Sequence, residues 1–84
     1  MADANIRLEC LCPAEGWAQP TGEEVREVLR LAGFTGSKAA KMLGLGPQGD
    51  RTIRRWVGAD TPIPYAAWAL LCDFAGQGAI WKRE

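Results

Sequence analysis

Residues 37 to 57 read SKAAKMLGLGPQGDRTIRRWV, and this stretch decides the fold of the 84-residue chain. Its first part has small and apolar residues at helical spacing, with Thr35 placed to cap a short helix and Gly44 to end it. Three glycines and a proline then crowd into GLGPQG, which predicts a turn. Asp50 can cap the next helix, which we expect over residues 51–57. The stretch therefore predicts two short helices joined by a turn.

The second of these helices has an apolar side and a basic side. Steps of about 100° per residue put Trp56 on the same side as Ile53. Arg51 and Arg55 fall almost opposite, and Arg54 flanks them. The planar guanidinium fork of arginine can take two acceptors on a guanine edge or bind a phosphate. Such a helix has an apolar back that fixes it and long donors at its front, which is what a helix in a DNA groove needs.

The same arginines also fit a simpler interpretation, because basic residues at helical spacing are typical of a solvated helix face. The segment before them favours DNA. A short Ala-Ala helix, a glycine turn and a capped basic helix form the helix-turn-helix layout, in which small residues let two helices cross closely. We therefore predict a mainly α, four-helix helix-turn-helix domain.

Charge is distributed unevenly along the chain. Ten Lys and Arg balance ten Asp and Glu, so the net charge predicts no nucleic-acid partner by itself. From residue 35 to 58, however, five basic residues face the single acid Asp50. We expect one basic face and one acidic face, an asymmetry that the sum over the whole chain hides.

Two further helices complete the predicted core. Thr21 and Glu24 form a capping box that starts one of them, and Gly33 ends it. The other starts at Pro64 and stops at Gly76, and it carries one charge in YAAWALLCDFA. A helix that is apolar nearly all round is either the central core helix or half of a subunit interface.

The two ends of the chain are predicted differently. IRLECLC, residues 6–12, alternates as an extended strand does. A lone strand needs a partner, so we expect it to pair with the tail AIWK, residues 79–82, or with the same strand of a second copy. The predicted single domain, 1–84, therefore has an extended arm or strand and loop at 1–20, a helical core at 21–76 and a tail at 77–84.

Apolar side chains divide into a core set and an interface set. The helical faces predict core anchors at Ile53, Trp56, Trp68 and Leu71. Tryptophans outside the helices suggest either packing onto the domain or a subunit contact, of which we favour the contact. The candidate dimer interface consists of Ile6, Leu8, Trp17, Phe74 and Trp81.

The sequence contains few residues that could form a catalytic or metal site. The chain has no histidine and a single serine, Ser37, so we predict that it is not an enzyme. Structural zinc takes four Cys or His ligands, and Cys10, Cys12 and Cys72 fall short of that number within one copy. GLGPQG lacks the Gly-Lys-Ser/Thr of a phosphate-binding loop. We predict buried thiols, no metal and no cofactor.

No apolar run approaches the length of a membrane helix, and the N-terminus lacks the order of a signal peptide. We therefore expect a cytoplasmic protein without a membrane partner.

The run GFTGSKAAKMLGLGPQGDRTIRRWVGADTPIPYAAWALL resembles the small helix-turn-helix repressors of phages and mobile elements. This Cro/repressor-like group includes the autorepressors associated with anti-CRISPR genes. The resemblance covers about residues 22 to 75 and rests on the order of Ala-Ala, Leu-Gly, Arg-Thr-Ile-Arg-Arg-Trp and Pro-Ile-Pro-Tyr. The turn GLGPQGD departs from the pattern, because it is longer than the usual link by about three residues.

The resemblance implies a DNA-binding role for two sets of residues. The base-reading set would be Arg51, Thr52, Arg54 and Arg55. The phosphate-binding set would be Ser37, Lys38 and Lys41, to which we add Gln48 from the long turn. Members of the group bind inverted repeats as dimers and repress the operon that encodes them. The prediction is thus a sequence-specific transcriptional regulator, a dimeric autorepressor with double-stranded DNA as its partner.

A rival interpretation keeps the scaffold and changes the partner. A helix-turn-helix domain can be repurposed to bind another protein, as an inhibitor of the anti-CRISPR kind or as an antitoxin. Zero net charge and tryptophans outside the helices are compatible with it. It would be favoured if the acidic first helix of another copy covered the basic face.

Overall fold

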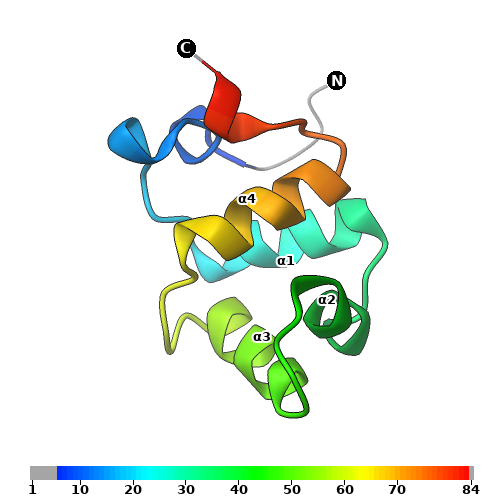
Figure 1. Ribbon diagram of the computed structural model, residues 1–84. Helices are drawn as coiled ribbons and strands as arrows, with labels where there is room; N and C mark the ends of the chain where they lie inside the picture. The colour runs from blue at the N-terminus through cyan, green and yellow to red at the C-terminus, as the bar shows by residue number, and fades with distance from the viewer. Residues whose placement is uncertain (1–5, 84) are drawn as a thin grey trace.

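The computed structural model describes residues 6–83 and is mainly helical. Four α-helices are α1 (Gly22–Ala32), α2 (Gly36–Leu43), α3 (Gly49–Val57) and α4 (Tyr65–Phe74). Three single-turn 3-10 helices are η1 (Leu8–Cys10), η2 (Ala14–Gly16) and η3 (Ile80–Lys82). In Figure 1, α1 and α4 lie across the middle, α2 and α3 form the lower end, and the two terminal segments meet at the upper end.

The helix boundaries follow from local signals. The Thr21 hydroxyl accepts a hydrogen bond from the Glu24 N–H, and the Glu24 carboxylate accepts one from the Thr21 N–H, so the predicted capping box is confirmed. Thr35 caps α2 in the same manner through the Lys38 N–H. Gly33 and Gly44 end their helices with φ of 74° and 68°, in the left-handed region that glycine adopts without strain.

The core lies between α1 and α4 and extends over the back of α2 and α3. Trp68 is fully buried at its centre, and its indole Nε1–H donates a 2.7 Å hydrogen bond to the Cys10 carbonyl. That bond joins α4 to the N-terminal segment. Leu71 and Cys72 are also fully buried, so α4 is the central core helix for much of its surface.

The predicted N-terminal strand is wrong. Residues 8–10 form a 3-10 turn, in which the N–H groups of Cys10 and Leu11 donate to the carbonyls of Arg7 and Leu8. Side-chain burial does not alternate along this segment as it would along a strand, because Cys10 and Leu11 are both buried while Leu8 is 76% exposed. These short-range hydrogen bonds satisfy the backbone without a strand partner.

The predicted pairing with the tail fails for the same reason. Residues 80–82 form a second 3-10 turn, whose Ile80 is buried in the core. Within residues 6–83 there is no β-strand for either end of the chain to pair with.

The start of α3 also differs from prediction. The helix begins at Gly49 and its N-cap is Gln48, which makes no side-chain capping bond, so Asp50 lies in the first turn instead of capping it. Packing explains the earlier start. A Cβ at Gly49 would lie 2.6 Å from the Cβ of Ala40 and 2.8 Å from that of Leu45, so glycine lets α3 approach α2 this closely.

Candidate DNA-binding face

One side of α3 is fixed in the core. Ile53 and Trp56 are buried, with 1% and 5% of their surface exposed, and they pack in the same cluster as Ala39 and Ala40 of α2. The end of α3 meets the start of α1 so closely that a Cβ on Gly22 would lie 2.0 Å from the Val57 carbonyl oxygen. The position of α3 is therefore set along its whole length by neighbouring helices.

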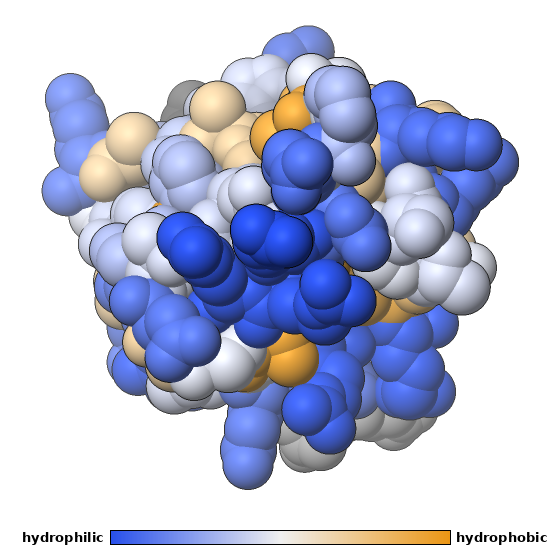
Figure 2. Space-filling model, turned by 90° about the horizontal axis from the view of Figure 1, so that it is seen from below, coloured by the Kyte–Doolittle hydropathy of each residue, from blue (hydrophilic) through white to orange (hydrophobic). Residues whose placement is uncertain are grey.

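The other side of α3 is exposed and basic. Arg51, Arg54 and Arg55 are exposed, whereas Thr52 is half-buried. Figure 2 views the molecule from the α2–α3 end and shows the most hydrophilic side chains gathered across the centre of that face. The arginine guanidinium groups thus stand on a rigid helix and face solvent.

The proposed phosphate-binding residues lie on α2 and at the start of α3, at the same end of the molecule as the arginines. Ser37, Lys38 and Lys41 are exposed on α2, and Gln48 is exposed at the start of α3. A hollow at the surface beside α2, the turn and the start of α3 is lined by Ser37, Ala40, Lys41, Gly46, Pro47 and Asp50. The structure therefore brings both predicted DNA-binding sets to the α2–α3 end of the molecule.

A single carboxylate interrupts the basic surface. Asp50 Oδ2 lies 3.8 Å from Arg54 Nη1, one helical turn away. Both groups are open to solvent, with side-chain exposures of 44% for Asp50 and 71% for Arg54. An exposed pair of this kind contributes little to folding stability.

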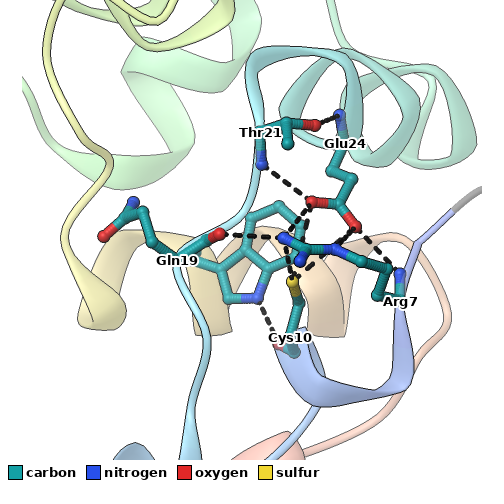
Figure 3. Close-up of polar contacts among 6 residues, drawn as sticks. Arg7, Cys10, Gln19, Thr21 and Glu24 are labelled. Carbon is teal, nitrogen blue, oxygen red and sulfur yellow. Dashed lines mark hydrogen bonds and ion pairs between the residues drawn. The ribbon is translucent and has the colours of Figure 1, made fainter.

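The α1 acids lie in a separate hollow, which is lined by Arg7, Thr21, Glu23, Glu24 and Glu27. Figure 3 shows the Arg7 guanidinium between the Glu24 carboxylate, the Gln19 carbonyl and the Cys10 thiol. Arg7 Nε and Nη2 each lie 3.0 Å from a Glu24 carboxylate oxygen, and the Arg7 N–H donates to the same carboxylate at 2.9 Å. This cluster ties the N-terminal segment to α1.

Electrostatics at this cluster favour the ionised carboxylate. Burial opposes ionisation of Glu24, but hydrogen bonds from the Arg7 guanidinium and from the N–H groups of Arg7 and Thr21 outweigh it and lower its pKa to about 2. The hydrogen bond to Glu24 raises the pKa of Arg7. Burial, followed by the Glu24 charge, raises the pKa of the Cys10 thiol to about 11. Cys10 is thus a protonated, unreactive thiol at neutral pH.

Sequence reasoning missed the second role of Glu24. The sequence predicted that Glu24 takes part in the capping box. Arg7 lies 17 residues earlier, and no local pattern indicates that Arg7 and Glu24 form an ion pair. Glu9 is an acid close to Arg7 in the sequence, but the Arg7 hydrogen bonds in this cluster go to Glu24 instead. Only the tertiary fold reveals this ion pair.

The candidate interface residues have mixed environments. Leu8, Phe74 and Trp81 are exposed, and Ile6 is half-buried. Trp17 packs onto its own domain, with its ring edge-on to Tyr65 at a centroid separation of 5.1 Å. An apolar groove that the sequence did not predict is lined by Tyr65, Ala66, Ala69, Leu70 and Trp81.

Within residues 6–83, no group of three or more Cys, Asp or Glu side chains is placed to hold a metal ion. The three cysteines are free thiols, of which Cys10 and Cys72 are buried. Burial raises the pKa of Cys72 to about 12.

Across the described part of the chain, none of the helices is both long enough and apolar enough to cross a membrane.

Comparison with known proteins gives two close relatives. A protein of Escherichia coli named transcriptional repressor protein KorC is 86% identical over 81 residues, which cover 96% of this chain and 95% of that protein. A second Escherichia coli protein of the same name is 74% identical over 84 residues, which cover 100% of this chain and 99% of that protein. No protein-family model and no solved structure matches the chain.

The predicted kinship with transcriptional repressors is confirmed, whereas the narrower Cro-like and anti-CRISPR-associated grouping stays a prediction. The chain belongs to the KorC family of transcriptional repressors.

Proposed function

We propose that this repressor binds double-stranded DNA through the α2–α3 end, with α3 in the major groove. The observation that carries the proposal is the division of α3 into a buried back, Ile53 and Trp56, and an exposed front of three arginines. A helix held this rigidly can present donors to base edges at fixed positions. Repression would then follow from occupation of DNA at a promoter.

The two residue sets have different tasks in this proposal. Ser37, Lys38, Lys41 and Gln48 bind phosphates, which sets the register of the protein on DNA but reads no sequence. Arg51, Arg54 and Arg55 reach base edges, where each bidentate arginine contact discriminates by about 1–3 kcal/mol. Thr52 is half-buried, so its reach is limited to a phosphate or a thymine methyl group close to the helix.

We further propose that two copies act together on an inverted repeat. Two α3 helices about 34 Å apart would enter successive major grooves on one side of the duplex. Exposed Trp81 and Leu70, each 43% exposed, border the apolar groove and offer a surface for a second copy, with Leu8 and Phe74 as further candidates. Repression of its own operon and an origin in a phage or mobile element remain predictions from the family resemblance.

The protein-binding alternative receives less support from α1. Glu24 is engaged by Arg7 and Glu27 by Arg30 within the same chain. Carboxylates paired in this way offer less free negative charge to the basic face of another copy than DNA phosphates do.

A competition gel shift tests the proposal directly. The probe is DNA from just upstream of the protein's own gene, and the competitor is excess unrelated DNA at fixed, moderate salt. We expect a shift that resists the competitor, and a loss of that shift in Arg55→Ala. Lys82→Ala, in η3 at the opposite end of the molecule, is the charge-matched control and should bind as the wild type does.

Two results would count against this function. A shift that the competitor removes completely would show charge-driven binding without sequence preference. Equal losses in Arg55→Ala and Lys82→Ala would show that α3 has no special place in binding. In either case, capture of a host protein by the folded chain becomes the better experiment.

A further inference from the structure

Asp50 is out of place on a surface that binds DNA. It is the only acid between residues 35 and 58, and it lies in the first turn of α3 beside the exposed arginines. Its carboxylate repels phosphates and therefore weakens binding to every DNA sequence. A residue with that effect on the flank of the arginine cluster calls for an explanation.

Folding supplies only a small part of the explanation. Asp50 is not the N-cap of α3, which is Gln48. An acid in the first turn complements the helix dipole, but this effect is modest at an exposed position. The ion-pair partner of Asp50 is the Arg54 guanidinium, 3.8 Å away and one turn further along the helix.

We propose that Asp50 is a specificity-determining residue that positions Arg54 for reading a base. The inference rests on the proposed function of α3. Arginine has many rotamers, and a carboxylate one turn earlier favours those in which the guanidinium stays close to the helix axis. From there the fork can donate to a guanine edge, while its remaining N–H groups still face Asp50.

The ion pair acts differently on correct and incorrect DNA. On the correct site, Arg54 keeps Asp50 while it contacts the base, and the loss of water strengthens the attraction between them. On unrelated DNA, Arg54 gains most by turning to a phosphate, which leaves the Asp50 carboxylate unpaired in a field of negative charge. Asp50 therefore lowers affinity for incorrect sites more than for the correct one.

Asp50→Asn tests this by removing the charge while keeping the side-chain shape. Affinities for the upstream site and for unrelated DNA are measured by fluorescence anisotropy at matched salt. We expect affinity for unrelated DNA to rise and the specificity ratio to fall roughly fivefold, with the loss confined to one base pair per half-site. Asp73→Asn, on exposed α4 surface, has the same charge change and should leave the ratio unchanged.

Two more variants separate positioning from a general charge effect. In an Arg54→Ala background, Asp50→Asn should leave the ratio nearly unchanged, because the side chain that it positions is gone. Asp50→Glu should restore much of the wild-type ratio, since a glutamate also reaches an arginine four residues later. A role limited to helix stability would change the melting temperature and scale all affinities together.

The outcomes are distinguishable. A wild-type protein that shows no preference for any DNA overturns both the proposed function and this inference. A wild-type protein that discriminates, with an Asp50→Asn variant of equal ratio, overturns the inference alone. A fall in ratio that persists without Arg54 also overturns it, because positioning would not be the cause.

Discussion

Helices α3 and α4 are nearly equal in length, with nine and ten residues, but they present their side chains in different ways. α4 buries Trp68, Leu71 and Cys72 completely and carries one charge. α3 buries Ile53 and Trp56 and leaves three arginines in solvent. In so small a chain, α4 supplies much of the core, whereas α3 is held by its neighbours and its outer side is exposed to solvent. Changes in α4 should therefore act on stability, and changes on the outer side of α3 should act on binding.

The largest expected effect lies in α4. Trp68→Ala removes the largest fully buried side chain and the hydrogen bond to the Cys10 carbonyl, so we expect a loss of about 3–5 kcal/mol in the free energy of unfolding. Urea denaturation followed by circular dichroism measures it. Leu70→Ala, on the exposed side of the same helix, is the control and should lose far less. Equal losses in the two variants would contradict the assignment of α4 as the core helix.

The ion pair that supports α1 predicts a pH dependence. The Glu24 pKa is about 2 in the folded protein, below its unfolded value, so the ionised carboxylate stabilises the fold above about pH 4.5. That contribution is at most about 3 kcal/mol, because solvent at the half-exposed Arg7 side chain screens the ion pair, and it should disappear as the pH falls from about 4.5 towards 2. Melting curves between pH 7 and 2 measure it.

Glu24→Gln sharpens the same prediction. The variant should be less stable than the wild type at pH 7, and the difference should shrink as the pH falls, because the wild-type carboxylate becomes protonated. Glu23→Gln, at an exposed neighbouring position, is the control. A constant difference at all pH values would show that the Glu24 charge does not stabilise the fold.

The close contact between Gly22 of α1 and Val57 of α3 predicts an intermediate effect on stability. In Gly22→Ala, the new Cβ would lie 2.0 Å from the Val57 backbone oxygen, so α3 must shift at a cost of about 1–3 kcal/mol. Specific DNA affinity should fall as well, because the arginines move with α3. Gly36→Ala is the control, since its Cβ would make an ordinary 3.8 Å contact with Ile53. A Gly22→Ala variant with wild-type stability and affinity would show that this contact does not position α3.

The smallest expected effect belongs to Lys38, one of the proposed phosphate-binding residues. Lys38→Ala should weaken binding to correct and unrelated DNA by similar factors and reduce the salt slope by about 1. The change should leave the melting temperature unaffected, because Lys38 is exposed and its backbone N–H still reaches Thr35. Anisotropy titrations at several salt concentrations measure it. If only the correct site lost affinity, Lys38 would belong to the base-reading set instead.

The features that sequence predicted are those with local causes. The capping box at Thr21, the threonine cap of α2 and the two terminal glycines each depend on residues within one or two turns. The buried and exposed sides of α3 follow from its helical period, because Arg51 and Arg55 lie almost opposite Ile53 on the same short helix. Burial of Trp68 follows from the apolar character of α4.

The features that sequence missed depend on distant partners. Alternation in IRLECLC was compatible with a strand, but local turns and the Arg7–Glu24 ion pair hold that segment instead. The first residue of α3 was misplaced because the contact of Gly49 with Ala40 is tertiary. For the candidate site, residue periodicity predicted the exposed arginines. The Asp50–Arg54 pair was missed although it joins residues four apart on one helix, whereas the apolar groove beside Trp81 forms only where α4 and the tail meet.

The central claim is that the outer side of α3 reads DNA sequence, and base-preference profiles test it most directly. Wild type, Arg51→Ala and Arg55→Ala are each bound to a library in which every position of the upstream site is varied, at one salt concentration. We predict that each variant keeps its fold and loses preference at its own base pair in each half-site, by about 1–3 kcal/mol. Profiles that keep the same shape while affinity falls evenly would contradict the claim, because arginines that bind only phosphates do not read sequence.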